Sequence, residues 1–528
     1  MKIRLHINDL RPADETGLLV RQLQRVHGAS NISVDAQPGI ELPRSVRTLL
    51  TLERMLHRMA AATHKPSASG IESTSSSSDD QPDVVIDLRG DAPPAKNAKQ
   101  NLKVLYDGVC DDRRIYAALL ASRLPLIEIA DASSRRVLAA GTPCVDNAET
   151  LAEAAQYIFA RVATLISSAI AQPRSLAPGN ALEVVLPGVM RLAEIELRNL
   201  ANAASRRLYR LCCHAPHWRI GWRLNDGPGV AEQHNLGGEP WRVLADPGNR
   251  FYADPMPIVV NGRMYIFFED FPHATRKGII SFVEVNVDGS VGPVQPVLEE
   301  SWHLSYPFLL QIGADIFMVP ESSGARDVAV YRAEPFPHRW VRHGTLLSGI
   351  DLNDATIVEH NAKLWMFGTT RDGAGSPSDT LSIFSADRLE GSWTPHPQNP
   401  IIIDAAAARP AGPCFRQGNR LWRVTQDCRA GYGKAIGLVE VLQLDEHSYE
   451  QRLDCVIRPD AAWPGRRFHT LARAGNLECI DGSAHAPKSR MVSRLMSQNW
   501  RGLAPLGGPA DAKSHGGDLS PSRLACED

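Results

Sequence analysis

The sequence lacks several features that would assign it quickly to a class of protein. It has no apolar run long enough to predict a membrane-spanning helix, and its first residues lack the continuous apolar core of a secretory signal. Its 9 Cys are scattered, and no Cys-x-x-Cys pair occurs. This pattern predicts reduced thiols, a cytoplasmic location and no structural zinc.

A large excess of charge of one sign and the common phosphate-binding motifs are also missing. The net charge is −2 and no long basic block occurs, so nucleic acid is not an expected partner. Neither Gly-x-Gly-x-x-Gly nor Gly-x-x-x-x-Gly-Lys-Ser/Thr occurs in residues 1–175. That region therefore carries no sequence signal for a nucleotide phosphate, and the sequence contains no motif that identifies a cofactor.

What is present is the composition of an ordinary globular chain. Hydrophobic residues make up 43% and charged residues 22% of the 528 residues, which predicts two or three domains with a large core. All ten Trp lie from Trp218 onward, so the second half is the aromatic-rich half. These figures predict a multidomain protein whose two halves differ in character.

Strand-like and helix-like segments alternate through residues 1–175. Strands are predicted at 2–6, 31–35, 82–88 and 102–106, helices at 15–26, 46–61, 113–122 and 148–170, and a hairpin at 124–139. This alternation predicts an α/β, Rossmann-like domain with an open, largely parallel sheet. A Ser-rich segment at about 65–81 is predicted to be a disordered insertion.

This region resembles the N-terminal domain of folate-dependent formyltransferases. The resemblance rests on the order of DVVIDLRGD (83–91), LKVLYDG (102–108) and RLPLIEIAD (123–131). The family works with an Asn-His-Asp set, and no His stands in the corresponding stretch here. The resemblance therefore implies a degenerate scaffold, with formyl transfer as an alternative activity.

Residues 176–236 are predicted to be a helical connector, because an amphipathic helix within Pro187–Arg210 ends in several Arg. The strand near Trp218–Leu224 is predicted to pair with the last repeat of the second half. Residues 484–528 are rich in Ser, Gly, Pro and charge, which predicts a disordered tail.

A unit of strand, small polar turn and aromatic-rich strand recurs five times within residues 237–483. The five segments are Tyr252–Asp270, Ser305–Ser322, Asn353–Thr370, Arg409–Gln426 and Phe468–Gly482. In the first, Asn261-Gly262 joins two β-rich runs, which is a strong hairpin signal. Repeats of this size, each forming a small sheet, predict an all-β five-bladed propeller.

Polar residues at equivalent ends of the blade strands are expected to converge. The starts of the first strands supply Asp254, Tyr306, Asp354, Arg409 and His469, and the ends of the second strands supply Glu269, Asp270, Glu321, Gln426 and Asp427. Carboxylates beside Arg, His and aromatic rings suit a polyhydroxylated ligand such as a sugar. Converging oxygens are also compatible with a divalent cation, although no loop matches a calcium motif.

The repeats resemble the propeller domain of the glucosamine inositolphosphorylceramide transferase family. The resemblance rests on ADP…FFED (253–270), SYPF (305–308), NDAT (353–356), RPAG (409–412) and HTL…IDG (469–482). More broadly, the first blade resembles five-bladed arabinanases and invertases. The resemblance implies a carbohydrate-active protein, and in those hydrolases an Asp at the position of Asp254 serves as base or nucleophile.

The fourth repeat departs from the hydrolases. They open this blade with an acidic Glu, whereas Arg409-Pro410-Ala411-Gly412 has no carboxylate. Glycoside hydrolysis normally needs two carboxyl groups, but transfer from a sugar phosphate or nucleotide sugar needs only a base and a cation for the phosphate. We therefore predict a glycosyltransferase acting on a bacterial glycan or glycolipid, with Asp254 as base and Arg409 on the donor phosphate.

Two other functions of the propeller stay open on the sequence alone. One is glycoside hydrolysis with Glu321 as an unusual acid. The other is carbohydrate binding without catalysis, which the same set of polar and aromatic residues would also permit.

Overall fold

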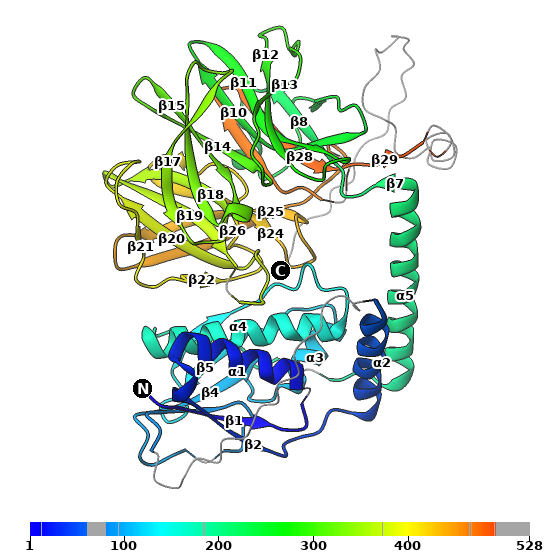
Figure 1. The fold of residues 1–528 in the computed structure, drawn as a ribbon, viewed down its shortest axis with the longest axis vertical. Helices are drawn as coiled ribbons and strands as arrows, with labels where there is room; N and C mark the ends of the chain where they lie inside the picture. Colours follow the sequence, from blue (N-terminus) through cyan, green and yellow to red (C-terminus); the bar gives the residue numbers. More distant parts are fainter. Residues whose placement is uncertain are drawn as a thin grey trace, which may run out of the picture.

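The computed structural model describes residues 1–11, 13–60, 81–92, 94–182, 185–371, 373–463, 465, 467–489 and 492. An α/β half lies below a β-propeller half in Figure 1, and one long helix runs along the edge of both. The predicted insertion at 65–81 lies outside the described residues except for residue 81, and so does the tail from 493 onward.

The described N-terminal residues contain a mixed sheet in the order β2-β1-β3-β4-β5-β6. The strands are β1 (Ile3–Asn8), β2 (Ile32–Gln37), β3 (Val84–Asp87), β4 (Gln100–Tyr106), β5 (Ile127–Asp131) and β6 (Val137–Gly141). The first four run parallel, while β5 and β6 form an antiparallel hairpin at one edge. The predicted alternation is present, but the hairpin makes the sheet mixed, so the Rossmann-like description stays a prediction.

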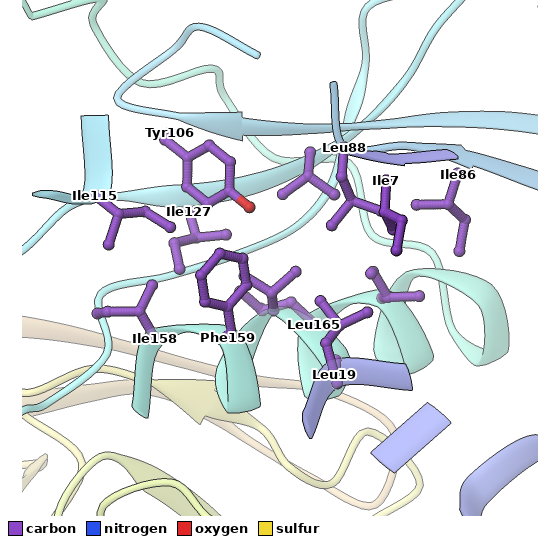
Figure 2. Packing of buried hydrophobic residues seen from close by; sticks show 14 of the residues in the cluster. Ile7, Leu19, Ile86, Leu88, Tyr106, Ile115, Ile127, Ile158, Phe159 and Leu165 are labelled. Atoms are coloured by element: carbon purple, nitrogen blue, oxygen red, sulfur yellow. The ribbon is translucent and has the colours of Figure 1, made fainter. Parts of the chain in front are cut away.

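Helices cover this sheet and join it to the rest of the chain. They are α1 (Ala13–His27), α2 (Arg44–Ala60), α3 (Arg113–Leu120), α4 (Leu151–Ala171) and α5 (Val189–Cys212). Thr150 caps the N-terminus of α4, because its side chain accepts a hydrogen bond from the backbone N–H of Glu153. Figure 2 shows Ile158 and Phe159 of α4 pointing toward Tyr106 on the sheet, within one continuous apolar core.

Helix α4 also faces the propeller. The Arg161 side chain is fully buried, and its Nε donates to Asp379 Oδ1 at 2.9 Å. The backbone N–H of Cys144 donates to the other oxygen of Asp379 at 2.7 Å. The hydroxyls of Ser376 and Ser378 both donate to Asp146 at 2.7 Å. The α/β half is therefore docked on the propeller through buried polar contacts.

By length and composition, α4 is the one helix in the described part of the chain that could cross a membrane. In the structure, 67% of its most apolar window is buried inside the protein, as in the core helix of a globular domain. This makes α4 weak evidence for a membrane span.

Within the described residues, the second half forms the five blades that the repeats predict. Blade one contains β10 (Arg250–Val260), β11 (Arg263–Pro272), β12 (Ile279–Val285) and β13 (Gln295–Leu298). Blade two contains β14 (Ser305–Ile312), β15 (Asp315–Glu321), β16 (Asp327–Ala333) and β17 (Trp340–Ser348). Blade three contains β18 (Leu352–His360), β19 (Lys363–Thr370), β20 (Thr380–Ala386), β21 (Thr394–Pro395) and β22 (Ile402–Ile403). Blade four contains β23 (Phe415–Gln417), β24 (Arg420–Asp427), β25 (Ala435–Leu444) and β26 (Tyr449–Ile457). Each blade buries one apolar face against the next, because strand residues alternate between two faces.

Blade five is built from both ends of the propeller. It contains β27 (Leu471–Ala474), β28 (Leu477–Ser483), β8 (Trp218–Leu224) and β9 (Arg242–Val243). Antiparallel pairing of β8 with β28 confirms the predicted closure and covers an edge that would otherwise be open. The start of the predicted tail is paired too, because β29 (Ala486–Pro487) pairs with β7 (Cys213–His214).

We expect Arg161→Met to lower the stability of the whole chain strongly. The change leaves the Asp379 carboxylate buried without its guanidinium, which costs about 3–5 kcal/mol of unfolding free energy. Chemical denaturation followed by Trp fluorescence measures this change. The matched control is Arg191→Met, because the Arg191–Glu194 pair is exposed and should be worth less than about 1 kcal/mol. Equal effects of the two substitutions would contradict the expectation.

Candidate active site at the centre of the propeller

The first strands of blades one to three carry the same backbone irregularity. The pairing register slips by one residue between Ala253 and Met256, between Ser305 and Phe308, and between Asn353 and Thr356. Inside these bulges, Asp254, Tyr306 and Asp354 have φ of 52°, 42° and 54°, which is uncommon for residues other than Gly. Strained backbone of this kind tends to gather at functional sites, where surrounding contacts hold it in place.

Asp254 is held by neighbouring blades. Its Oδ1 accepts a hydrogen bond from Thr470 Oγ1 at 3.0 Å, and its Oδ2 accepts one from the backbone N–H of Tyr306 at 3.3 Å. Burial raises the pKa of Asp254 to about 6, and the negative charges of Asp481 and Asp354 add to the rise. A carboxylate with this pKa can accept a proton near neutral pH.

His469 lies between two carboxylates. Its Nδ1 is 2.5 Å from Asp481 Oδ2, and its Nε2 is 3.9 Å from Asp254 Oδ1. Burial alone would lower the pKa of His469, but the charges of Asp481 and Asp254 outweigh it and raise the pKa. The ring stacks on Trp218 with centroids 3.9 Å apart. The arrangement favours an imidazolium at this position.

The same three residues bear on the question of a cation. Asp254, His469 and Asp481 each offer a ligand atom, and these atoms lie within 4.8 Å of one another. Two carboxylates and an imidazole suit a divalent transition metal better than calcium. In this structure the three groups instead satisfy one another, with Asp481 also accepting from the backbone N–H of Asp254 at 3.2 Å.

A second pair of opposite charges stands beside the first. Arg409 Nε donates to Asp354 Oδ2 at 2.6 Å, and the guanidinium lies 5.1 Å from the centre of the Tyr432 ring. Arg409 Nη2 is 3.8 Å from Glu321 Oε2, which is too long for a hydrogen bond. Gln426 Nε2 also donates to Asp354, at 3.3 Å. Arg409 is thus anchored through Nε, while its two Nη groups make no hydrogen bond within the described residues.

Two further carboxyl groups, Glu321 and Glu269, lie beside these residues. We call the whole set the central cluster, and it consists of Asp254, Glu269, Glu321, Asp354, Arg409, His469 and Asp481. Burial, reinforced by nearby carboxylates, raises the pKa of both Glu321 and Glu269 well above the usual range. Glu321 accepts a hydrogen bond from the backbone N–H of Asp354 at 3.1 Å. The side chains of Asp254 and Glu321 keep 11% and 10% of their surface exposed, so the central cluster reaches solvent at these two groups.

Two predicted site residues lie apart from the central cluster. Asp270 accepts from Arg250 at 2.8 Å and from Ser281 at 2.9 Å, while Asp427 pairs with Arg429 at 2.8 Å. The expectation that they converge with the others was wrong. Successive residues of a strand point to opposite faces, so only one of each adjacent pair can face the centre.

The predicted site did not include Asp481, Thr470 or Tyr432, although the motif HTL…IDG (469–482) contains Thr470 and Asp481. Asp481 stands near the end of the second strand of blade five, the kind of position that supplies Glu269 and Glu321, so the repeat alignment contained its signal. Tyr432 lies in the loop after β24, outside any strand pattern. Only the tertiary structure places its ring over Arg409.

The α/β half contacts the loop that carries Tyr432. Cys144 Sγ donates a weak hydrogen bond to the backbone carbonyl of Cys428 at 3.5 Å. Leu124 and Tyr432 pack against the small buried cluster that these two Cys form with Ala405. The α/β half is therefore in contact with one wall of the central cluster.

We expect Asp481→Asn to lower the pKa of His469. The change removes the nearest negative charge from a buried imidazole, so burial will again dominate. An NMR titration of the His ring resonances measures this shift, with the other His in the same spectrum as internal controls. A His469 resonance that titrates at the same pH in both proteins would contradict the expectation.

Two solved structures align with part of this chain at low TM-scores. A family 117 glycoside hydrolase from Zobellia galactanivorans aligns with a TM-score of 0.34 and 12% identity over 50% of this chain and 90% of that chain. The catalytic domain of the Coprinopsis cinerea GH62 alpha-L-arabinofuranosidase aligns with a TM-score of 0.34 and 12% identity, over 44% of this chain and 81% of that chain.

Sequence relatives match the propeller. Glucosamine inositolphosphorylceramide transferase 1 from Arabidopsis thaliana is 32% identical over 232 residues, which is 42% of this chain and 30% of that protein. The protein of the same name from Oryza sativa subsp. japonica is 30% identical over 251 residues, which is 45% of this chain and 33% of that protein. The chain thus spans about a third of the length of these relatives.

One family model matches as well, over residues 244–478, and its description is Glucosamine inositolphosphorylceramide transferase 1, N-terminal. Residues 1–243 lie outside this match, so the formyltransferase resemblance of the α/β half stays a prediction. The family resemblance predicted from the five repeats is confirmed: the propeller of this chain is similar to the N-terminal region of the glucosamine inositolphosphorylceramide transferase 1 family.

Proposed function

We propose that the propeller transfers a sugar from a phosphate-linked donor to a hydroxyl of a glycan or glycolipid. The observation that carries the proposal is Asp254, a buried carboxylate with a pKa of about 6 beside the imidazolium of His469. The transferase names of the relatives that match this half support the same reaction class. A nucleotide sugar or sugar phosphate is the donor class that fits.

In this proposal Asp254 activates the acceptor. The acceptor oxygen forms a bond to the anomeric carbon of the donor sugar, and its proton passes to Asp254 Oδ. The bond from the anomeric carbon to the phosphate oxygen breaks, and that electron pair leaves with the phosphate. His469 stabilises the ionised form of Asp254 before the proton arrives, because its own pKa is raised.

Arg409 serves the leaving group. Its Nε is anchored by Asp354 at 2.6 Å, which leaves both Nη groups to donate hydrogen bonds to a phosphate. A phosphate departs as an anion, so blade four needs a cation there and no acid. Asp354, Glu269 and Gln426 would then hold sugar hydroxyls or position the residues that do.

Glycoside hydrolysis is a second candidate, favoured by one observation. Burial, with a further contribution from the charge of Asp354, raises the pKa of Glu321 well above its usual range, which favours the protonated form of this carboxyl group. A protonated carboxyl group at this place could protonate a leaving oxygen. A hydrolase would release sugar from neutral glycosides, whereas the transferase would need a phosphate-linked donor.

We expect Asp254→Asn to reduce turnover by about 10²–10⁴-fold while donor binding stays within a few fold, because it removes the base and keeps the shape. Calorimetry and turnover with a panel of nucleotide sugars, sugar phosphates and neutral glycosides measure both effects. Asp387→Asn is the matched control, since the Asp387 side chain is 85% exposed and away from the central cluster. Unchanged turnover in Asp254→Asn would contradict catalysis by this residue, and binding without any turnover in the native chain would favour a carbohydrate-binding propeller.

The acid side of the pH–rate profile should follow Asp254. Its carboxylate is the active form, so kcat/KM should rise with pH and level off above a pKa of about 6. The profile is best recorded with a donor whose phosphate does not titrate between pH 5 and 7. If the acid side of the kcat/KM profile instead gives a pKa near the usual Asp value of about 4, that result would contradict Asp254 as the base.

A further inference from the structure

Helix α5 carries an exposed apolar face along its whole length. We call this face the α5 stripe, and it consists of Val189, Ala193, Leu197, Leu200, Ala204, Leu208 and Leu211. The exposed fractions of its large side chains are 68% for Val189, 71% for Leu197, 57% for Leu200, 64% for Leu208 and 76% for Leu211. A row of this kind exceeds the single apolar residues that protein surfaces normally show.

The spacing of the α5 stripe is typical of helix pairing. Its members are separated by four, four and three residues, and then again by four, four and three. This 11-residue repeat corresponds to 3.67 residues per turn, so the row stays on one face of a nearly straight helix. Leu192 and Ile195 are the residues of α5 that are buried within the chain, and they point to another side. Figure 1 shows α5 at the edge of the molecule, between α2 and β7.

We propose that the α5 stripe pairs with the α5 stripe of a second copy of this chain, antiparallel, about a two-fold axis near Leu200. In this register Leu197 faces Ala204, Ala193 faces Leu208, and Val189 faces Leu211. A large side chain then meets a small one in the Leu197–Ala204 and Ala193–Leu208 pairs, which allows close approach of the two helices between the axis and the apolar contacts at Val189–Leu211. The proposal does not rest on the function of the propeller.

Charges beside the α5 stripe specify the antiparallel direction. At 100° per residue, Glu196 in the first half of α5 and Arg207 in the second half lie on the same flank of the α5 stripe. A two-fold axis across an antiparallel pair makes like flanks face each other, so Glu196 of one copy faces Arg207 of the other. A parallel pair about a two-fold axis brings opposite flanks together, so it would not place Glu196 beside Arg207.

The central test is the mass of the full chain in solution. Sedimentation equilibrium of the native chain should give a dimer at micromolar concentration. Leu200→Glu puts two carboxylates against each other at the two-fold axis and should raise the dissociation constant at least about 100-fold. Asn202→Glu adds the same charge to an exposed position outside the α5 stripe and should leave the constant unchanged. A native monomer, or a dimer that persists in Leu200→Glu, would overturn the proposal.

A charge exchange tests the direction of pairing. Glu196→Arg and Arg207→Glu should each weaken the homodimer by about 3–10-fold, because each brings like charges together at two symmetric places. A mixture of the two variants should form a heterodimer of nearly native affinity, since every facing pair is again opposite in sign. No recovery in the mixture would overturn the antiparallel register. A different outcome is that the native chain is monomeric and binds anionic phosphatidylserine vesicles, while Leu200→Glu does not bind them. That result would overturn the proposal, because the α5 stripe would then contact a membrane surface and not a second copy of the chain.

Discussion

The central cluster depends on the balance between buried negative and positive charge. Five carboxyl groups meet there, from Asp254, Glu269, Glu321, Asp354 and Asp481. They face the guanidinium of Arg409 and the imidazoles of His469 and His303, and burial lowers the pKa of His303, which favours its neutral form. Two cations cannot neutralise five carboxylates, and an unpaired buried charge is costly, so the pKa of several carboxyl groups rises. Raised pKa values are what proton transfer near neutral pH requires. The excess of buried negative charge therefore has two effects: it lowers the stability of the folded protein, and it raises the carboxyl pKa values on which the proposed chemistry depends.

The backbone that presents this cluster is held from several directions. Asp254 and Asp354 have positive φ inside bulges, and hydrogen bonds from neighbouring blades fix their carboxylates. Closure of the ring by β8 joins the two ends of the propeller in one blade, so separating these ends would expose the edges of β8 and β28. The α/β half adds a contact on the loop of Tyr432. Strain at the centre is thus maintained by the whole ring rather than by local sequence.

Much of the fold could be predicted because its signals are local and repeated. The five strand–turn–strand units, the helix at α4 and the hairpin of β5 and β6 were all expected from periodicity and turn residues. The mixed character of the first sheet could not be predicted with the same precision, since strand direction is set by pairing at a distance. In the site, the repeat alignment placed Asp254, Asp354 and Arg409 together, but it treated Asp270 and Asp427 as members because alternation was not applied within each strand.

The sequence by itself determined the number of blades, the candidate residues on the first strands of blades one to three and the family that the propeller resembles, because local motifs repeat along the chain. The tertiary structure decided which charges meet: that His469 bridges Asp481 and Asp254, and that Asp354 anchors Arg409. It also decided that Arg161 docks the α/β half through Asp379. Those pairs join residues up to 218 positions apart, from Arg161 to Asp379, and only the packing of the folded chain determines the distance between them.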